Sequence, residues 1–250
     1  MNKRNRPYKK ASSLVQDIEK FLAKHSATFR SQGSRISHYF EMGCYNDVVK
    51  FYEKNGFMVS AQNLKGTEFR YKISANGDPD NFSHFIVSKT IRDTVYEFEI
   101  HHNLSLECPH ESEIFYTADI SVINKGSIVR INPETYTQKR SCCRGANLQT
   151  FFEVKHMAPF PELLFSFVGI PENILVKENR NIEVQHLAPA LLMSGKANYH
   201  GEKIKNYLQG KYEINIIFNI FGTPSIIYSN SYPKKKIGTL LQSPLPAVGN

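Results

Sequence analysis

The chain is 250 residues long, 41% of its residues are hydrophobic, and its formal net charge at pH 7 is +8. This hydrophobic content suffices for the interior of a globular protein, and the basic balance favours a polyanionic partner. No stretch approaches the roughly 20 apolar residues that cross a bilayer, and the N-terminus lacks a signal-peptide core. Four irregularly spaced cysteines exclude a disulfide scaffold. We therefore expect a cytoplasmic protein with no membrane partner.

The first part of the chain predicts a flexible end followed by two helices. Residues 1–12 are rich in lysine and arginine, and we expect them to be flexible. Apolar residues at helical spacing begin at Leu14 and predict a first helix, which ends at a Ser- and Gly-rich break over residues 31–34. A second apolar stripe predicts a helix over residues 37–55, with Gly56 as its C-terminal stop.

Strand patterns fill the middle of the chain, and helix signals return near its end. The predicted strands cover residues 57–61, 68–73, 84–87, 94–106, 114–123 and 148–156. Later elements are a helix from Pro161 to about Gly169, helix candidates at residues 182–193 and 200–208, and a buried strand at residues 212–220.

These elements predict one domain of the α/β (α+β) class. We expect a mixed central sheet flanked by helices, with additional antiparallel strands ahead of the last two strands of the middle region. The domain should span residues 13–231. Prolines punctuate residues 232–250, and we expect them to form a flexible tail.

Two predicted strands carry charged residues inside apolar runs. Asp119 interrupts the strand over residues 114–123, and the tripeptide Glu153-Val154-Lys155 interrupts the strand over residues 148–156. Because side chains alternate across a strand, Glu153 and Lys155 must project from the same face. A charge at the edge of a core is costly in a purely structural role. We therefore expect Asp119, Glu153 and Lys155 to converge on one site.

Phosphodiester hydrolysis requires residues of these types. Carboxylates such as Asp119 and Glu153 bind the hard cations Mg²⁺ or Mn²⁺, which neutralise phosphoryl charge and generate a nucleophile near neutral pH. An ammonium such as that of Lys155 can orient or activate the attacking water and stabilise charge in the transition state. The sequence therefore predicts a metal-dependent phosphodiesterase site.

The order of Asp119, then Glu153-Val154-Lys155 in an apolar strand, then a helical stretch and a further apolar strand resembles the PD-(D/E)xK nuclease superfamily. The resemblance extends over residues 35–221 as a pattern of elements. It implies a restriction-endonuclease-like core and a Mg²⁺-dependent endonuclease acting on DNA. Members often carry another acid on the helix before the core sheet, and Glu41 would supplement the metal site from there. Ala118 stands where the family often has proline, and the connection between the acids is long.

The connection between the two charged strands is basic. Its five cationic residues face a single acid and are candidates for binding nucleic acid: Lys125, Arg130, Lys139, Arg140 and Arg144. If the strands converge, this connection lies beside the site and could bind phosphates with release of counterions. An ordinary solvated loop is the alternative.

Two further groups of polar residues offer other sites. The first lies on one side of a predicted strand and could join the active site, but a solvent-facing strand surface explains it equally well and is the interpretation we favour: Glu97, Glu99 and His101. The second has ligand types that suit zinc: Cys108, His110, Cys142 and Cys143. Its adjacent cysteines lack the two-to-four-residue spacer of zinc sites, so we do not expect it to bind metal.

Three functions remain open on the sequence, and the least specific is a structural partner whose apolar C-terminal strand and helices dock on another protein. The first is a divalent-metal-dependent nuclease, which could work as a homodimer or in a larger assembly. The alternative is a non-catalytic nucleic-acid-binding or assembly subunit in which the acids are structural. That subunit would bind nucleic acid in a salt-sensitive way without turnover.

Overall fold

The computed structural model describes residues 11–30, 33, 35–130, 141–176, 183–221, 225–228 and 236–240. The helices are α1 (Ala11–Lys24), α2 (Ile36–Lys54), α3 (Pro161–Ile174) and α4 (Tyr199–Lys211), with short 3-10 helices η1 (Pro79–Asn81) and η2 (Gly145–Asn147). The strands are β1 (Thr28–Phe29), β2 (Met58–Gln62), β3 (Glu68–Phe69), β4 (His84–Ile91), β5 (Thr94–Glu107), β6 (Phe115–Asn124), β7 (Ile128–Arg130), β8 (Ser141–Arg144), β9 (Leu148–Lys155), β10 (Ala190–Met193), β11 (Asn215–Ile217), β12 (Ser225–Tyr228) and β13 (Lys236–Leu240).

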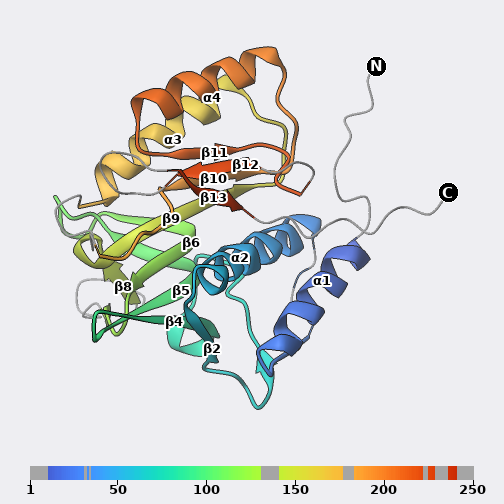
Figure 1. The fold of residues 1–250 in the computed structure, drawn as a ribbon, viewed down its shortest axis with the longest axis vertical. Coiled ribbons are helices and arrows are strands. Elements are labelled where there is room, and N and C mark those ends of the chain that lie inside the picture. The colour runs from blue at the N-terminus through green and yellow to red at the C-terminus, as the bar shows by residue number, and fades with distance from the viewer. Residues whose placement is uncertain are drawn as a thin grey trace.

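A mixed nine-stranded sheet is the framework of the molecule (Figure 1). Its main order is β11-β10-β9-β6-β5-β4-β2, and β8 pairs with both β5 and β7. The strands from β2 to β9 along this order are antiparallel, whereas β9, β10 and β11 are parallel to one another. Parallel neighbours need a crossover, which α3 and α4 provide here. The predicted fold class is confirmed: an α+β protein with a mixed sheet and antiparallel strands ahead of β6 and β9.

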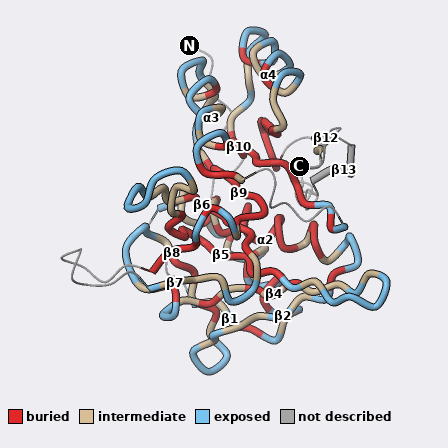
Figure 2. The backbone as a smooth tube through the Cα atoms, turned by 90° about the vertical axis from the view of Figure 1, so that its left-hand side faces the viewer, coloured by how far each residue is buried: buried red, intermediate tan, exposed pale blue. Residues whose placement is uncertain are grey.

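Helices cover both faces of the sheet. Alternate residues of β10 belong to different cores: Ala190 and Leu192 pack in a cluster with residues of α1 and α2, while Leu191 and Met193 pack in a cluster with residues of α3 and α4. Figure 2 shows buried backbone along β9, β10 and α2. None of the helices in the described part of the chain combines the length and apolar character that a membrane span requires.

The prediction of a helix over residues 182–193 is wrong, since Ala190–Met193 is strand β10, which lies between β9 and β11. A strand buried on both faces reads as a continuous apolar run, which periodicity cannot distinguish from a buried helix.

Three other predicted boundaries also differ from the structure. Helix α3 continues through Pro171 to Ile174 instead of ending near Gly169. The strand expected over residues 212–220 is limited to β11, and the strand expected over residues 68–73 is limited to β3. In contrast, α1 and α2 form where the apolar stripes predict them, with Leu14 and Phe40 buried.

Strand β5 contains a residue with left-handed backbone in its C-terminal half, Asn103, with φ of 52°. Asparagine tolerates this conformation better than most residues. Before it, Phe98 and Ile100 pack in the core that contains α1 and α2; after it, Leu104 and Leu106 pack in the opposite core. A regular strand would place all four side chains on one face. The alternation of β5 side chains between the two faces of the sheet is therefore reversed at Asn103, the residue next to His102.

Candidate active site

Asp119 and the Glu153-Val154-Lys155 tripeptide lie on adjacent strands. β6 and β9 are antiparallel neighbours, and their regular pairing reaches Ile120↔Phe152, one residue short of Asp119 and Glu153. On its other edge β9 pairs with β10, which places Leu191 opposite Glu153. The two acids therefore come from the centre of the sheet.

The Lys155 ammonium connects the two carboxylates. Lys155 Nζ lies 3.0 Å from Asp119 Oδ2 and 2.8 Å from Glu153 Oε2. Asp119 Oδ2 also accepts a hydrogen bond of 2.7 Å from the backbone N–H of Val154, so this carboxylate takes over the link between β6 and β9 where regular pairing ends. The structure thus brings together the three residues that the sequence singles out.

Glu41 approaches the same group from helix α2. Its charge interacts with those of Asp119, Lys155 and Glu153. Glu41 Oε2 also lies 4.0 Å from Nε2 of His102, which is fully buried. Burial lowers the pKa of His102 to about 3, with Lys72 and His38 acting in the same direction, so this imidazole is neutral near pH 7. Glu41 therefore gains no full counter-charge from His102.

Crowding of acids perturbs the ionisation of the site. Burial, with repulsion from Asp119 and Glu153, raises the pKa of Glu41 to about 7 despite attraction to Lys155. Burial and Asp119 also raise the pKa of Glu153, although contacts with Lys155 and Tyr116 oppose the rise. Burial acts to lower the pKa of Lys155, but Asp119 and Glu153 raise it above its ordinary value. The Lys155 ammonium thus contacts two carboxylates, those of Asp119 and Glu153, and interacts through its charge with a third, that of Glu41.

The donor set fits a hard divalent cation. Glu153 is 6% exposed, and its Oε1 is a buried atom with no hydrogen-bond partner. A buried carboxylate oxygen normally has a partner, so an orphan beside further acids favours a bound cation. Carboxylate oxygens suit Mg²⁺ or Mn²⁺, and Mg²⁺ usually takes one or two protein carboxylates. Asp119 and Glu153 are the residues that would hold such an ion, with Glu41 at its margin.

The basic residues predicted to bind nucleic acid are only partly described. Lys139 and Arg140 lie outside the described residues. The other three pair with acids at the surface: Lys125 with Glu97, Arg130 with Asp80, and Arg144 with Glu107. Surface pairs of this kind are weak, so they leave the cations available to a polyanion.

The expectation of a solvent-facing surface for Glu97, Glu99 and His101 is wrong for two of the three. Glu97 is exposed, but Glu99 and His101 are 9% and 5% exposed. They lie beside His84 of β4, and one ligand atom from each of the three lies within 4.8 Å of the others. Within the described residues this is the one group of three potential ligands at such spacing. His84 was missed because only the pairing of β4 with β5 brings it to His101.

The cysteine and histidine group of the sequence does not assemble as a metal site within the described residues. Cys142 and Cys143 are buried on β8, Cys108 is partly exposed, and none of the three forms a disulfide.

Comparisons with known proteins give little further information. No protein-family model matches the chain, and no curated protein matches it. Among solved structures, the chain is similar to NucC of E. coli MS115-1 in its cAAA-bound form, with 10% sequence identity and a TM-score of 0.32. The match covers 84% of this chain and 73% of that chain. A TM-score this low does not establish a shared fold.

Proposed function

We propose that this protein is a divalent-metal-dependent nuclease of the PD-(D/E)xK type that hydrolyses phosphodiester bonds in DNA. The observation that carries the proposal is the meeting of the Asp119 and Glu153 carboxylates at the Lys155 ammonium, 3.0 and 2.8 Å away. The orphaned Oε1 of Glu153 supports a cation at this position.

Each residue has a distinct role in this proposal. Asp119 and Glu153 hold the cation, and Glu41 supplements them from α2. Bound Mg²⁺ would supply charge neutralisation at the phosphoryl group and an acidified water. Lys155 would orient the attacking water and donate hydrogen bonds to oxygens that gain charge in the transition state. The ammonium of Lys155 has three N–H donors, and two of them contact the carboxylates in this structure, so one donor remains for water or substrate.

The substrate part of the proposal rests on charge. The chain has a net charge of +8, and the exposed side chains of Lys125, Arg130 and Arg144 lie on or next to strands β6, β7 and β8. A polyanion that contacts such residues gains free energy from counterion release, and its affinity falls as salt rises. A nuclease of this kind could act as a homodimer or in a larger assembly, which sedimentation of the purified chain would measure.

The test compares cleavage by the parent with cleavage by Lys155→Met. Duplex DNA, single-stranded DNA and RNA are incubated with the full chain and Mg²⁺, Mn²⁺ or a chelator. We expect metal-dependent cleavage of DNA by the parent and a rate about 10²–10⁴-fold lower for Lys155→Met. Lys24→Met is the matched control, since Lys24 also pairs with a glutamate, Glu53, but far along the chain from the site.

Two results would contradict the proposal. Equal cleavage by the parent and Lys155→Met would remove the site assignment. Salt-sensitive DNA binding by the parent without turnover, unchanged by the chelator, would favour the non-catalytic nucleic-acid-binding subunit.

A further inference from the structure

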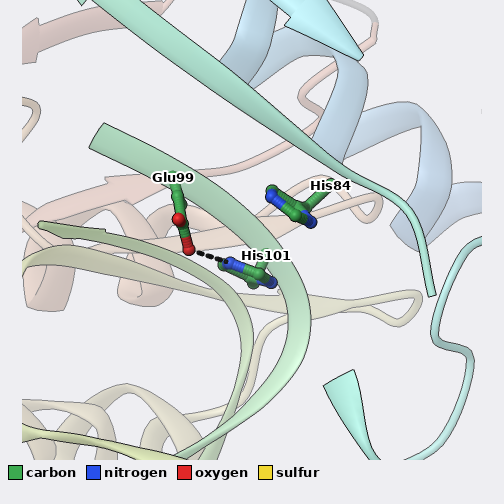
Figure 3. Close-up of side chains that lie close together, drawn as sticks. All are labelled: His84, Glu99 and His101. Carbon is green, nitrogen blue, oxygen red and sulfur yellow. Dashed lines mark hydrogen bonds and ion pairs between the residues drawn. The ribbon is translucent and has the colours of Figure 1, made fainter. Parts of the chain in front are cut away.

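A cavity on the sheet contains a second group of candidate metal ligands. Its volume is about 360 Å³, and His84, Glu99 and His101 are among the residues that line it. Figure 3 shows these three side chains close together, with Glu99 and His101 from β5 and His84 from the neighbouring strand β4. The proposed nuclease site does not use any of them.

We propose that His84, Glu99 and His101 form a zinc-binding site. Two imidazoles and one carboxylate are ligands that Zn²⁺ accepts at about 2.0–2.2 Å, and three protein ligands leave a fourth position for water or another small ligand. The cavity gives that fourth position room. Mg²⁺ prefers oxygen ligands and near-ideal octahedral geometry, so this donor set discriminates against it.

The three ligand atoms lie close together in the protein without a bound ion. One atom from each residue lies within 4.8 Å of the other two, and His101 Nε2 is 2.8 Å from Glu99 Oε2. Phe85 of β4 pairs with Ile100 of β5. Because the two strands are antiparallel, the next residues on each, His84 and His101, lie beside each other. Strand register therefore holds the ligands near one another, which lowers the entropy that binding must overcome.

The carboxylate of Glu99 is also held in position from behind. Its Oε1 accepts a hydrogen bond of 3.0 Å from the backbone N–H of Gly126, in the turn after β6. That bond leaves Oε2 to face His101. Outer hydrogen bonds that orient ligands in this way are characteristic of metal sites in proteins.

Coordination requires one local adjustment. The rings of His84 and His101 are stacked, with centroids 4.5 Å apart and planes 22° apart. Ring nitrogens bind a metal in the plane of the ring, so the two rings must turn until both point at one ion. His84 is only partly buried and borders the cavity, which gives its ring space to turn.

This zinc site is distinct from the proposed nuclease site. His101 and His102 are consecutive residues of β5, and consecutive side chains of a strand point to opposite faces. His101 lies in the cavity with Glu99, whereas His102 lies near Glu41 and against the ring of Tyr45 on α2. The zinc proposal therefore holds or fails independently of the nuclease.

The test measures zinc binding to the full chain after treatment with a chelator. Titration calorimetry is expected to give one Zn²⁺ per chain, with no competition from a large excess of Mg²⁺. His84→Gln and Glu99→Gln are each expected to weaken binding at least tenfold. Glu99→Gln keeps an acceptor for Gly126, so it removes the charge with little disturbance. His200→Gln, at an exposed position of α4, is the matched control and should bind as the parent does.

Two further arms exclude other zinc ligands. Asp119→Asn should bind zinc as tightly as the parent, because Asp119 belongs to the other site. Co²⁺ in place of Zn²⁺ should give visible absorption without a thiolate charge-transfer band, since the proposed ligand set contains no cysteine. The proposal is overturned if the parent binds no zinc, if His84→Gln and Glu99→Gln both bind like the parent, if Asp119→Asn abolishes binding, or if a thiolate band appears.

Discussion

His186 is expected to make the fold sensitive to mild acid. Its ring has no exposed surface, its Nδ1 lies 2.8 Å from the Tyr52 hydroxyl, and its Nε2 has no hydrogen-bond partner. The rings of Phe98 and His186 pack in a T-shaped arrangement at a centroid distance of 4.5 Å. Burial in this environment lowers the pKa of His186 from 6.5 to about 3. Protonation of His186 is therefore less favourable in the folded protein than in the unfolded chain.

The sign and size of the effect follow from this difference in pKa. Between pH 6.5 and about pH 3 the unfolded chain binds a proton at His186 that the folded chain does not. The stability contributed by neutral His186 is therefore complete above pH 6.5 and is lost as pH falls. At about pH 5 the loss is about 2 kcal/mol, since each pH unit is worth about 1.4 kcal/mol. A loss of this size is a large share of a typical folding free energy of roughly 5–15 kcal/mol.

Urea unfolding of the parent and of His186→Gln, at about pH 7.5 and about pH 5, measures this term. Glutamine can still accept a hydrogen bond from Tyr52, although the substitution lowers stability at both pH values. Every other titrating group is common to the two proteins and cancels. We expect the parent to lose about 2 kcal/mol more than the variant on acidification. Equal losses in both proteins would refute the reasoning.

Three further predictions concern Asp47, Gly195 and Glu41. Burial raises the pKa of Asp47 from 3.8 to about 6 despite its contact with Lys50, so the charge of Asp47 costs stability above pH 6. From acid to neutral pH, the stability of Asp47→Asn relative to the parent should therefore rise by up to about 3 kcal/mol. A difference in urea unfolding that does not change with pH would contradict this. A Cβ at Gly195 would lie 2.5 Å from Ala158 Cα, so Gly195→Ala should lower the free energy of unfolding by about 1–3 kcal/mol, whereas Gly169→Ala, with open space in α3, should not lower it. Glu41→Gln should reduce metal-dependent cleavage roughly 10–100-fold without abolishing DNA binding, and an unchanged rate would remove Glu41 from the site.

The sequence was sufficient to predict those parts of the fold and site that depend on local periodicity. Apolar stripes located α1 and α2, and strand alternation placed Glu153 and Lys155 on one face. The approach of Asp119 to Lys155 needed only that two apolar strands be neighbours. The catalytic roles of these residues stay predictions.

What the sequence could not show depends on long-range pairing. His84 reaches His101 only because β4 and β5 pair in a particular register, which nothing near His84 encodes. The strand at Ala190–Met193 has helices on both faces, and this tertiary context overrides a local pattern equally compatible with a helix. Glu99 is buried because the turn at Gly126 closes over it, and its partner is 27 positions away in the chain.

Because His101 and His102 are consecutive, the proposed zinc site and the surroundings of Glu41 both depend on the register of β5. Sliding this strand by one position would send each imidazole to the wrong side of the sheet, so the zinc ligand and the neighbour of Glu41 would be exchanged in one event. A single-residue insertion or deletion ahead of them in β5 should thus disable both regions together, whereas point substitutions can separate them. The hairpin tip at Arg92 and Asp93 is the place where added length is best tolerated, because both residues are exposed and neither side chain is committed to these regions.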